Sequence, residues 1–298
     1  AGSLLANALN DVGTRVSYRG QDISEETLAF SRGQFHSGVD AKVAIANTLE
    51  EEPWPGFQAD LVVVDPPWGV SWRQSEAVIK QRSAEGSFGF GLPELSDSLW
   101  LYVSLAIEKL RPASEGGGRV AALVHPGALS GKRASASIRR RIVDAGVLES
   151  VTRLPFSLAP NTEIPLYLLT FSNVATSKRD QVQLGDLQAH FVTENRRRAL
   201  TIDALEELER GLRTWKSGPR NRSANLRQFT RREVKVERAT PCGRKLRWHI
   251  TTHNDTPIDE QFLAMRYGQS GNPTIIEECA PVIDLDPGSI LRDSAKDV

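Results

Sequence analysis

The chain has 298 residues, 40% hydrophobic and 25% charged, and its 37 basic and 37 acidic side chains give a formal net charge of zero. It can bury one sizeable core with additional segments. The neutral charge excludes a protein that grips nucleic acid by a general basic excess, so any such contact is local or supplied by a partner.

The remaining totals are typical of a cytoplasmic protein without metal or membrane contacts. No stretch reaches the length of a transmembrane helix, and no signal peptide is visible. The two cysteines, Cys242 and Cys279, lie far apart, match no metal-ligand spacing and are expected to be reduced thiols.

The beginning of the chain alternates between helix and strand patterns. Helices are predicted over 4–12 and from Ser24, which is a good N-cap, to about residue 37. Short strands are predicted over 15–20 and 42–46, and the apolar run 60–64 predicts a strand in the interior of a parallel sheet. This alternation is typical of a doubly wound α/β fold.

Asp65-Pro66-Pro67-Trp68 follows the interior strand without a gap. Neither proline can donate to a strand ladder and both fix φ, so the backbone should leave the sheet as a stiff turn at its carboxyl edge. Open α/β sheets bind ligands at this edge. The turn therefore predicts a short pocket with a carboxylate acceptor and an indole stacking surface, although a tight turn after a core strand would have the same pattern.

Residues 69–92 are rich in glycine, serine and charge, and the segment is long for a connection in a compact domain. It is either a disordered insertion or a lid over the pocket. Further elements are expected in this order: a helix from Ser96 to 111, a strand over 119–124, a basic helix over 135–145, and strands over 147–154 and 165–171. The last two strands should pair antiparallel, because the loop between them is too short for a crossover helix.

The pattern weakens after residue 173. A strand over 181–184, an amphipathic helix over 201–213 and an edge strand over 233–237 are predicted. We expect a catalytic domain over 1–175, a mixed α/β extension over 176–267, and a polar tail or linker over 268–298.

Five segments resemble, in the same order, the modification subunit of type I restriction-modification systems, which are N6-adenine DNA methyltransferases. They are Gly2-Ser-Leu-Leu5, Gly20-Gln-Asp-Ile23, Asp65-Pro-Pro-Trp-Gly-Val-Ser-Trp72, Gly118-Arg-Val-Ala-Ala-Leu-Val-His-Pro-Gly-Ala-Leu129 and Ile164-Pro-Leu-Tyr-Leu-Leu169. The resemblance covers roughly residues 1–210. It implies a doubly wound, mostly parallel seven-stranded sheet of the S-adenosylmethionine-dependent type, with a terminal antiparallel hairpin and a less regular C-terminal extension.

The resemblance implies methyl transfer to the N6 amine of adenine. This amine is a poor nucleophile because its lone pair is delocalised into the ring. Two hydrogen-bond acceptors would orient the lone pair toward the methyl group. The Asp65 carboxylate and the Pro66 carbonyl could supply them, on the turn that Pro67 stiffens. Trp68 could stack on a base flipped out of its duplex. The family usually carries Asn-Pro-Pro-Phe or Asn-Pro-Pro-Tyr, whereas Asp-Pro-Pro-Trp occurs in other adenine-amino methyltransferases.

The resemblance also implies a cofactor site. Asp22, with Ile23 beside it, ends the second strand of such a sheet and would bind the ribose hydroxyls, unless it is an N-cap or a surface carboxylate. Asn47 and Thr48 stand where the family has an adenine contact, and Asp65 borders the same site.

Gly2 and Ser3 resemble the end of the cofactor loop. The earlier glycines and the acidic residue before them are absent from this chain, which we expect to be a fragment. We therefore expect S-adenosylmethionine to bind weakly or not at all, which leaves the chain's own activity open.

Several further residues are candidates for contact with DNA. The basic runs 139–141, 196–198 and 220–232 are candidate phosphate contacts or merely solvated faces. The loop 160–165 could face DNA. His125 could contact substrate or serve the structure.

Three functions remain open at this point. The first is the catalytic subunit of a DNA adenine methyltransferase that relies on a specificity subunit and works beside a restriction subunit. The second is an RNA or protein-glutamine amino methyltransferase, although such enzymes lack the downstream pattern quoted above. The third is a non-catalytic scaffold subunit that kept the fold.

Overall fold

A computed structural model describes residues 16–33, 35, 39–130, 133–158, 163–176, 181–194, 197–215, 220–225, 230–239, 245–253 and 274–283. The chain divides into two compact units, Ala1–Val124 with Leu168–Ser177, and His125–Tyr167 with Lys178–Val298. The predicted helix over 4–12 lies outside the described residues.

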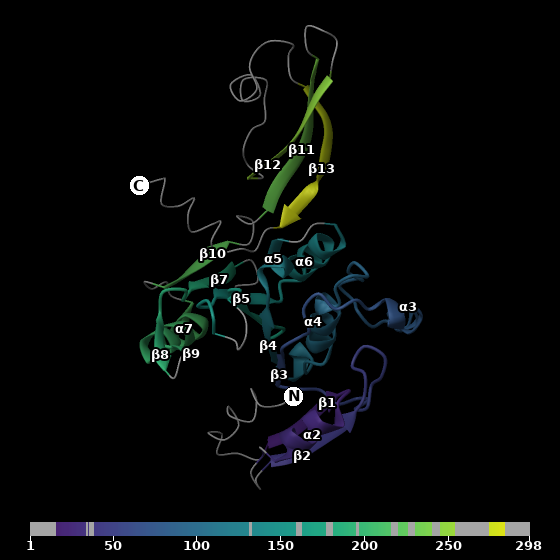
Figure 1. The fold of residues 1–298 in the computed structure, drawn as a ribbon, viewed down its shortest axis with the longest axis vertical. Helices are drawn as coiled ribbons and strands as arrows, with labels where there is room; N and C mark the ends of the chain where they lie inside the picture. The colour runs from purple at the N-terminus through teal and green to yellow at the C-terminus, as the bar shows by residue number, and fades with distance from the viewer. Residues whose placement is uncertain are drawn as a thin grey trace. The chain divides into compact units, whose positions relative to one another are not determined.

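The first unit contains both segments that were predicted to carry the chemistry (Figure 1). Its elements are β1 (Val16–Asp22), α2 (Glu25–Arg32), β2 (Val39–Ile45), β3 (Leu61–Val64), the 3-10 turn η1 (Arg73–Ser75), α3 (Glu76–Ala84), α4 (Leu99–Glu108), the 3-10 turn η2 (Ala113–Glu115), β4 (Arg119–Val124) and nearly all of β6 (Tyr167–Ser172).

The strands of this unit lie close to the predicted ranges, but the interior position expected for 60–64 is wrong, because among the described residues β3 pairs only with β4 and is half-buried. β3 and β4 are parallel neighbours in the register Val64↔Ala122, whereas β1 and β2 form a separate parallel pair in which Asp22 lies opposite Ile45. The predicted N-cap of α2 is confirmed, because the Ser24 hydroxyl accepts from the Thr27 amide at 3.2 Å.

Helix α4 is the central helix of the first unit and contacts β3 and β4. It was expected to begin at Ser96 but begins at Leu99, after the Asp97 carboxylate accepts from the Leu99 amide at 3.1 Å. Every residue from Leu99 to Ile107 except Tyr102 is buried. A helix that is apolar on all faces belongs inside a core, so α4 supports the strands that carry the site.

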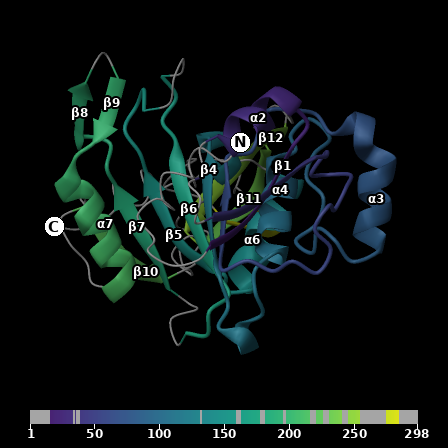
Figure 2. The ribbon, with the colours of Figure 1, turned by 90° about the horizontal axis from the view of Figure 1, so that it is seen from below.

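The second unit holds the remaining helices and strands (Figures 1 and 2). They are α5 (Pro126–Ser130), α6 (Ala134–Asp144), β5 (Leu148–Arg153), β7 (Gln181–Asp186), β8 (Phe191–Glu194), β9 (Arg197–Leu200), α7 (Ile202–Thr214), β10 (Asn221–Asn225), β11 (Thr230–Ala239), β12 (Lys245–His253) and β13 (Thr274–Ile283).

Strand pairing in the second unit is mixed. β5 and β7 are parallel, β7 and β10 are antiparallel, and α7 packs on β7 and β10 (Figure 2). The Leu154 amide donates to the Leu166 carbonyl at 2.8 Å, which joins the end of β5 to the residue before β6 as a hairpin requires. Antiparallel pairing of those two strands stays a prediction.

The expected seven-stranded, mostly parallel sheet is wrong. Within the described residues, β6, β4 and β3 are neighbours in the first unit and β10, β7 and β5 are neighbours in the second, where the pairing is mixed. The strand count differs from the expected one because β1 and β2 pair only with each other there.

The C-terminal region also holds more structure than expected. Residues 274–283, placed in a polar tail, form β13, which pairs antiparallel with β11, and β11 pairs with β12 (Figure 1). The β-branched residues Ile275, Ile276, Val282 and Ile283 favour the strand. Their signal was diluted by the polar residues around them. The predicted domain boundaries stay predictions.

Candidate functional site

The turn Asp65-Pro66-Pro67-Trp68 leaves the sheet at the carboxyl end of β3, as predicted. Pro66 is buried, whereas Asp65 and Pro67 are exposed. Gly69 follows with a φ of 62°, a left-handed conformation that a side chain would strain. Strand β3, which is half-buried from Val62 to Val64, and the buried Pro66 therefore fix the base of the turn, and the carboxylate is presented toward solvent.

The Asp65 carboxylate is partly desolvated even though it reaches solvent. Burial by the surrounding protein raises its pKa above the usual value. Trp68 is half-buried, and its indole Nε1 lies out of contact with solvent. A carboxylate beside a held aromatic ring can accept a hydrogen bond from a planar group that stacks on the ring.

Two of the predicted cofactor segments, Asp22-Ile23 and Asn47-Thr48, lie at the carboxyl edge of the β1–β2 pair. The Ala46 amide donates to the Asp22 carbonyl at 3.1 Å, which ties the two strand ends together. The Asp22 Oδ1 atom accepts from the Ser24 amide at 2.9 Å, an Asx turn that leads into α2, whose N-cap is Ser24 and not Asp22. Ile23 is 75% exposed and offers an apolar surface at this edge.

The charge of Asp22 extends over this edge. The pKa of Tyr18 is raised, first by burial and then by the Asp22 carboxylate, and the pKa of Tyr102 on α4 is raised by the same two causes in the same order. A negative potential here favours a cationic ligand. The carboxylate, the exposed Ile23 and this potential fit the ribose, the adenine and the sulfonium of S-adenosylmethionine.

Asn47 has a role in the fold that the sequence did not reveal. Its Oδ1 atom accepts from the Leu49 amide at 3.1 Å, and its Nδ2 atom donates to the Glu50 carboxylate at 2.7 Å. Asn47 therefore shapes the turn that contains Thr48, in the manner of an Asx turn. Its expected contact with adenine stays a prediction.

The segment 69–92 holds this turn from outside. Arg82 of α3 donates through Nη1 to the carbonyls of Thr48 at 3.1 Å and of Leu49 at 2.6 Å, and the Ser75 hydroxyl bonds to Glu50. Sequence reasoning missed Arg82, because its contacts join positions more than thirty residues apart, and it also missed Glu50, which bonds to Asn47 and Ser75.

The disordered alternative for 69–92 is wrong. Trp72, Ile79 and Phe88 are buried in one cluster with Leu49 and with residues of α4. The Trp72 indole also donates to the Glu94 carbonyl at 2.9 Å. The segment is therefore packed as a wall beside the 47–50 turn.

Other predicted residues are placed as follows. Gly2 and Ser3 lie outside the described residues. His125 Nδ1 accepts from the Gly127 amide at 3.1 Å, which supports its structural role at the start of α5. Arg139 is fully buried and donates to the Ala128 carbonyl at 2.9 Å, so its assignment as a phosphate contact is wrong.

Neither a membrane-spanning helix nor a cluster of metal ligands is present among the described residues. No helix there combines the length and apolar character needed to cross a membrane. No group of three or more histidine, cysteine, aspartate or glutamate side chains is arranged there to hold a metal ion.

Comparison with known proteins gives one family match. The model of a protein family described as N-6 DNA Methylase matches residues 1–237. No curated protein sequence matches the chain significantly.

Solved structures with a similar fold include two subunits of type I systems. The methyltransferase subunit of a type I restriction-modification system from Streptococcus thermophilus has a TM-score of 0.65 and 21% identity over 75% of this chain and 48% of its own. A modification subunit assigned to a type I restriction enzyme of Vibrio vulnificus has a TM-score of 0.52 and 18% identity over 76% and 46%.

A third similar structure comes from work on complex assembly and conformational transition of the type I R-M system. It has a TM-score of 0.56 and 19% identity over 76% of this chain and 50% of its own. At these identities the similarity shows a methyltransferase-like α/β fold. The chain spans about half the length of these neighbours.

Proposed function

Because the chain belongs to the N-6 DNA methylase family, we propose that it transfers a methyl group from S-adenosylmethionine to the N6 amine of adenine in DNA, as the modification subunit of a restriction-modification system. The observation that carries the proposal is the Asp65-Pro-Pro-Trp68 turn at the end of β3. It combines a partly desolvated carboxylate with a half-buried aromatic ring.

The Asp65 carboxylate accepts a hydrogen bond from one N–H of the adenine amine, and the Pro66 carbonyl accepts a hydrogen bond from the other N–H. These two acceptors direct the nitrogen lone pair toward the methyl donor, and Trp68 holds the ring by stacking on it. When bound, S-adenosylmethionine supplies the electrophilic methyl group. As the amine becomes positively charged, the ionised carboxylate stabilises that charge in place without reorganisation.

The cofactor is assigned to the β1–β2 edge. Asp22 accepts from the ribose hydroxyls through the carboxylate oxygen that does not bond to Ser24. Ile23 packs on the adenine ring, and the turn with Asn47 and Thr48 borders it. The bonds from Arg82 and Glu50 support this assignment, because they hold the turn in one shape before any ligand arrives.

Sequence recognition is assigned to a separate specificity subunit, and a restriction subunit would join the same assembly. The zero net charge supports this division, since one chain without a basic excess has little general affinity for DNA. One structural neighbour was also studied in the assembly of a type I R-M system.

The test uses the protein purified from its own host, so that partner subunits come with it. Wild-type protein should transfer tritiated methyl groups from S-adenosylmethionine to duplex DNA, and digestion should yield N6-methyladenine. Asp65→Ala should lower the transfer rate by at least about 100-fold, since it removes one of the two acceptors. Label found only in RNA or in protein glutamine would refute the proposal.

A further inference from the structure

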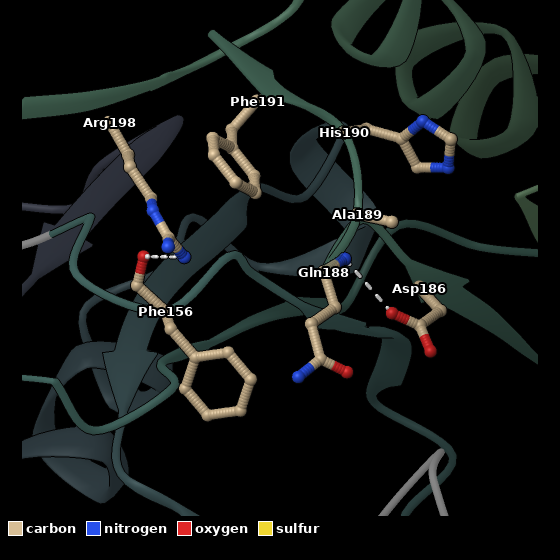
Figure 3. A pocket seen from close by; sticks show the side chains of 7 residues that line it. All are labelled: Phe156, Asp186, Gln188, Ala189, His190, Phe191 and Arg198. Atoms are coloured by element: carbon tan, nitrogen blue, oxygen red, sulfur yellow. Dashed lines mark hydrogen bonds between the residues drawn. The ribbon is translucent and has the colours of Figure 1, made fainter. Parts of the chain in front are cut away.

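The second unit contains a hollow that shares no residue with the Asp65 turn or the β1–β2 edge. Its volume is about 490 Å³, within the range of small-molecule sites. Phe156 follows β5, Asp186 is the last residue of β7, and Gln188 and His190 come directly after that strand (Figure 3). Because β5 and β7 are parallel, these residues lie at a shared carboxyl edge, where open α/β sheets bind ligands.

Two aromatic rings and a guanidinium line one part of the hollow. The Arg198 guanidinium of β9 lies 4.0 Å from the ring centre of Phe191 on β8. The same side chain donates through Nη1 to the Phe156 carbonyl at 3.2 Å, which links the β8–β9 hairpin to the end of β5. Phe156 and Phe191 are only half-buried, so part of each ring remains open to a ligand.

The hollow also offers directional polar groups. The side-chain amide of Gln188 makes no hydrogen bond to another described residue, so it can both donate and accept (Figure 3). His190 Nδ1 accepts from Arg220 Nε at 3.1 Å. The neutral imidazole then carries its hydrogen on Nε2, which makes that atom a donor.

Among the described side chains that line the hollow, Arg198 is a cation without a carboxylate partner. Arg153 pairs with Asp186 at 4.0 Å, and Arg220 pairs with Glu207 at 2.6 Å. Among the described residues, no carboxylate pairs with Arg198. A guanidinium without a carboxylate partner beside two aromatic rings suits a ligand that is planar and carries one negative charge.

We propose that this hollow binds one unpaired nucleotide of the DNA substrate. The base stacks on Phe156 or Phe191, the Gln188 amide bonds to its edge, and Arg198 holds the phosphate. The inference rests on the proposed function, because flipping an adenine leaves its partner base unpaired and a site that holds this base favours the opened duplex.

The first test measures binding of a fluorescein-labelled single strand of about 12 nucleotides by fluorescence anisotropy. A strand of the same length without bases carries the same phosphates and serves as the matched probe. The chain should bind the strand with bases more tightly. Phe191→Leu, which keeps an apolar side chain but removes the ring, should weaken binding of that strand by at least about fivefold and leave the abasic strand unchanged.

Control variants separate stacking from folding. Phe191→Tyr keeps an aromatic ring and should retain wild-type binding. Phe30→Leu removes a phenyl ring that is 66% exposed on α2 and should change neither affinity. Arg198→Ala should weaken the binding of both strands alike and lower the slope of log affinity against log salt by about 0.7.

Equal affinity for the strands with and without bases would overturn the proposal. So would a Phe191→Leu variant that binds both strands as tightly as the wild type does. Because these measurements need neither cofactor nor methyl transfer, they remain informative if the methyltransferase assay fails. Conversely, the Phe191→Leu variant could methylate duplex DNA at the wild-type rate and with an unchanged KM for DNA. That result would overturn the proposed role of the hollow and leave the proposed reaction intact.

Discussion

Asp65 must be ionised for the role proposed here, because a protonated carboxyl stabilises a developing positive charge poorly. Burial raises its pKa, so protonation sets in at a higher pH than for an ordinary aspartate. We expect the transfer rate to fall as the pH is lowered through this raised pKa. Asp65→Asn keeps an acceptor oxygen and should remove that acid limb, at the expense of a lower rate at neutral pH.

The measurement is the single-turnover transfer rate as a function of pH for the wild type and Asp65→Asn. Asp60→Asn is a matched control, since Asp60 lies just before β3, is 71% exposed and pairs with Arg111 at 2.8 Å. It should keep the acid limb. An acid limb that persists in Asp65→Asn would assign the titration to another group.

At the residue scale, the sequence predicted the groups that are proposed to act and missed the residues that hold the 47–50 turn in place. Asp65 and Asp22 follow strands directly, so a strand prediction placed both at carboxyl edges. Arg82 gave no such signal, because a single arginine in a polar segment is usually solvated. Its acceptors are main-chain carbonyls of Thr48 and Leu49, and main-chain acceptors exist at every position of a sequence.

At the element scale, the packed segment 69–92 contains the main departure from expectation. Its apolar residues Trp72, Ile79 and Phe88 stand far apart among glycines, serines and charges, so they form no helical or alternating pattern. They meet only because the chain turns between them and packs on Leu49 and α4. A strand such as β3 was easier to predict, since a continuous apolar run carries its own signal, whereas β8, β9, β10, β12 and β13 were not predicted.

Ile79 tests whether this segment is a packed wall. Its side chain is fully buried, whereas Val78 on the same helix is 39% exposed. Ile79→Ala should lower the free energy of unfolding by about 2–5 kcal/mol through lost burial and a cavity, and Val78→Ala should change it by less than about 0.5 kcal/mol. Urea unfolding followed by tryptophan fluorescence measures both, and equal effects would contradict the packed cluster.

The same packing predicts an effect on the cofactor edge. Loss of Ile79 loosens the helix that carries Arg82, and Arg82 fixes the carbonyls of Thr48 and Leu49. Flexibility at a binding turn raises the entropy lost when a ligand orders it. The wall therefore connects core packing to the shape of the proposed adenosine site.

At the scale of the whole molecule, the equal numbers of basic and acidic side chains limit how DNA can be held. Affinity for duplex DNA without sequence preference comes almost entirely from cations that neutralise phosphates. Here Arg139 is buried and Arg220 is paired with Glu207, so part of the basic complement is committed within the protein. The hollow beside Arg198 adds a local contact of the kind that the composition allows.

We therefore expect the chain alone to bind duplex DNA of arbitrary sequence weakly, with a Kd above about 1 µM at about 0.15 M salt. Its affinity should fall only gently as salt is raised, because few phosphates are neutralised at once. Fluorescence anisotropy with a labelled duplex at several salt concentrations measures both quantities. Submicromolar binding with a steep salt dependence would contradict this prediction. It would show that the chain has an extended basic surface and binds DNA without a second subunit.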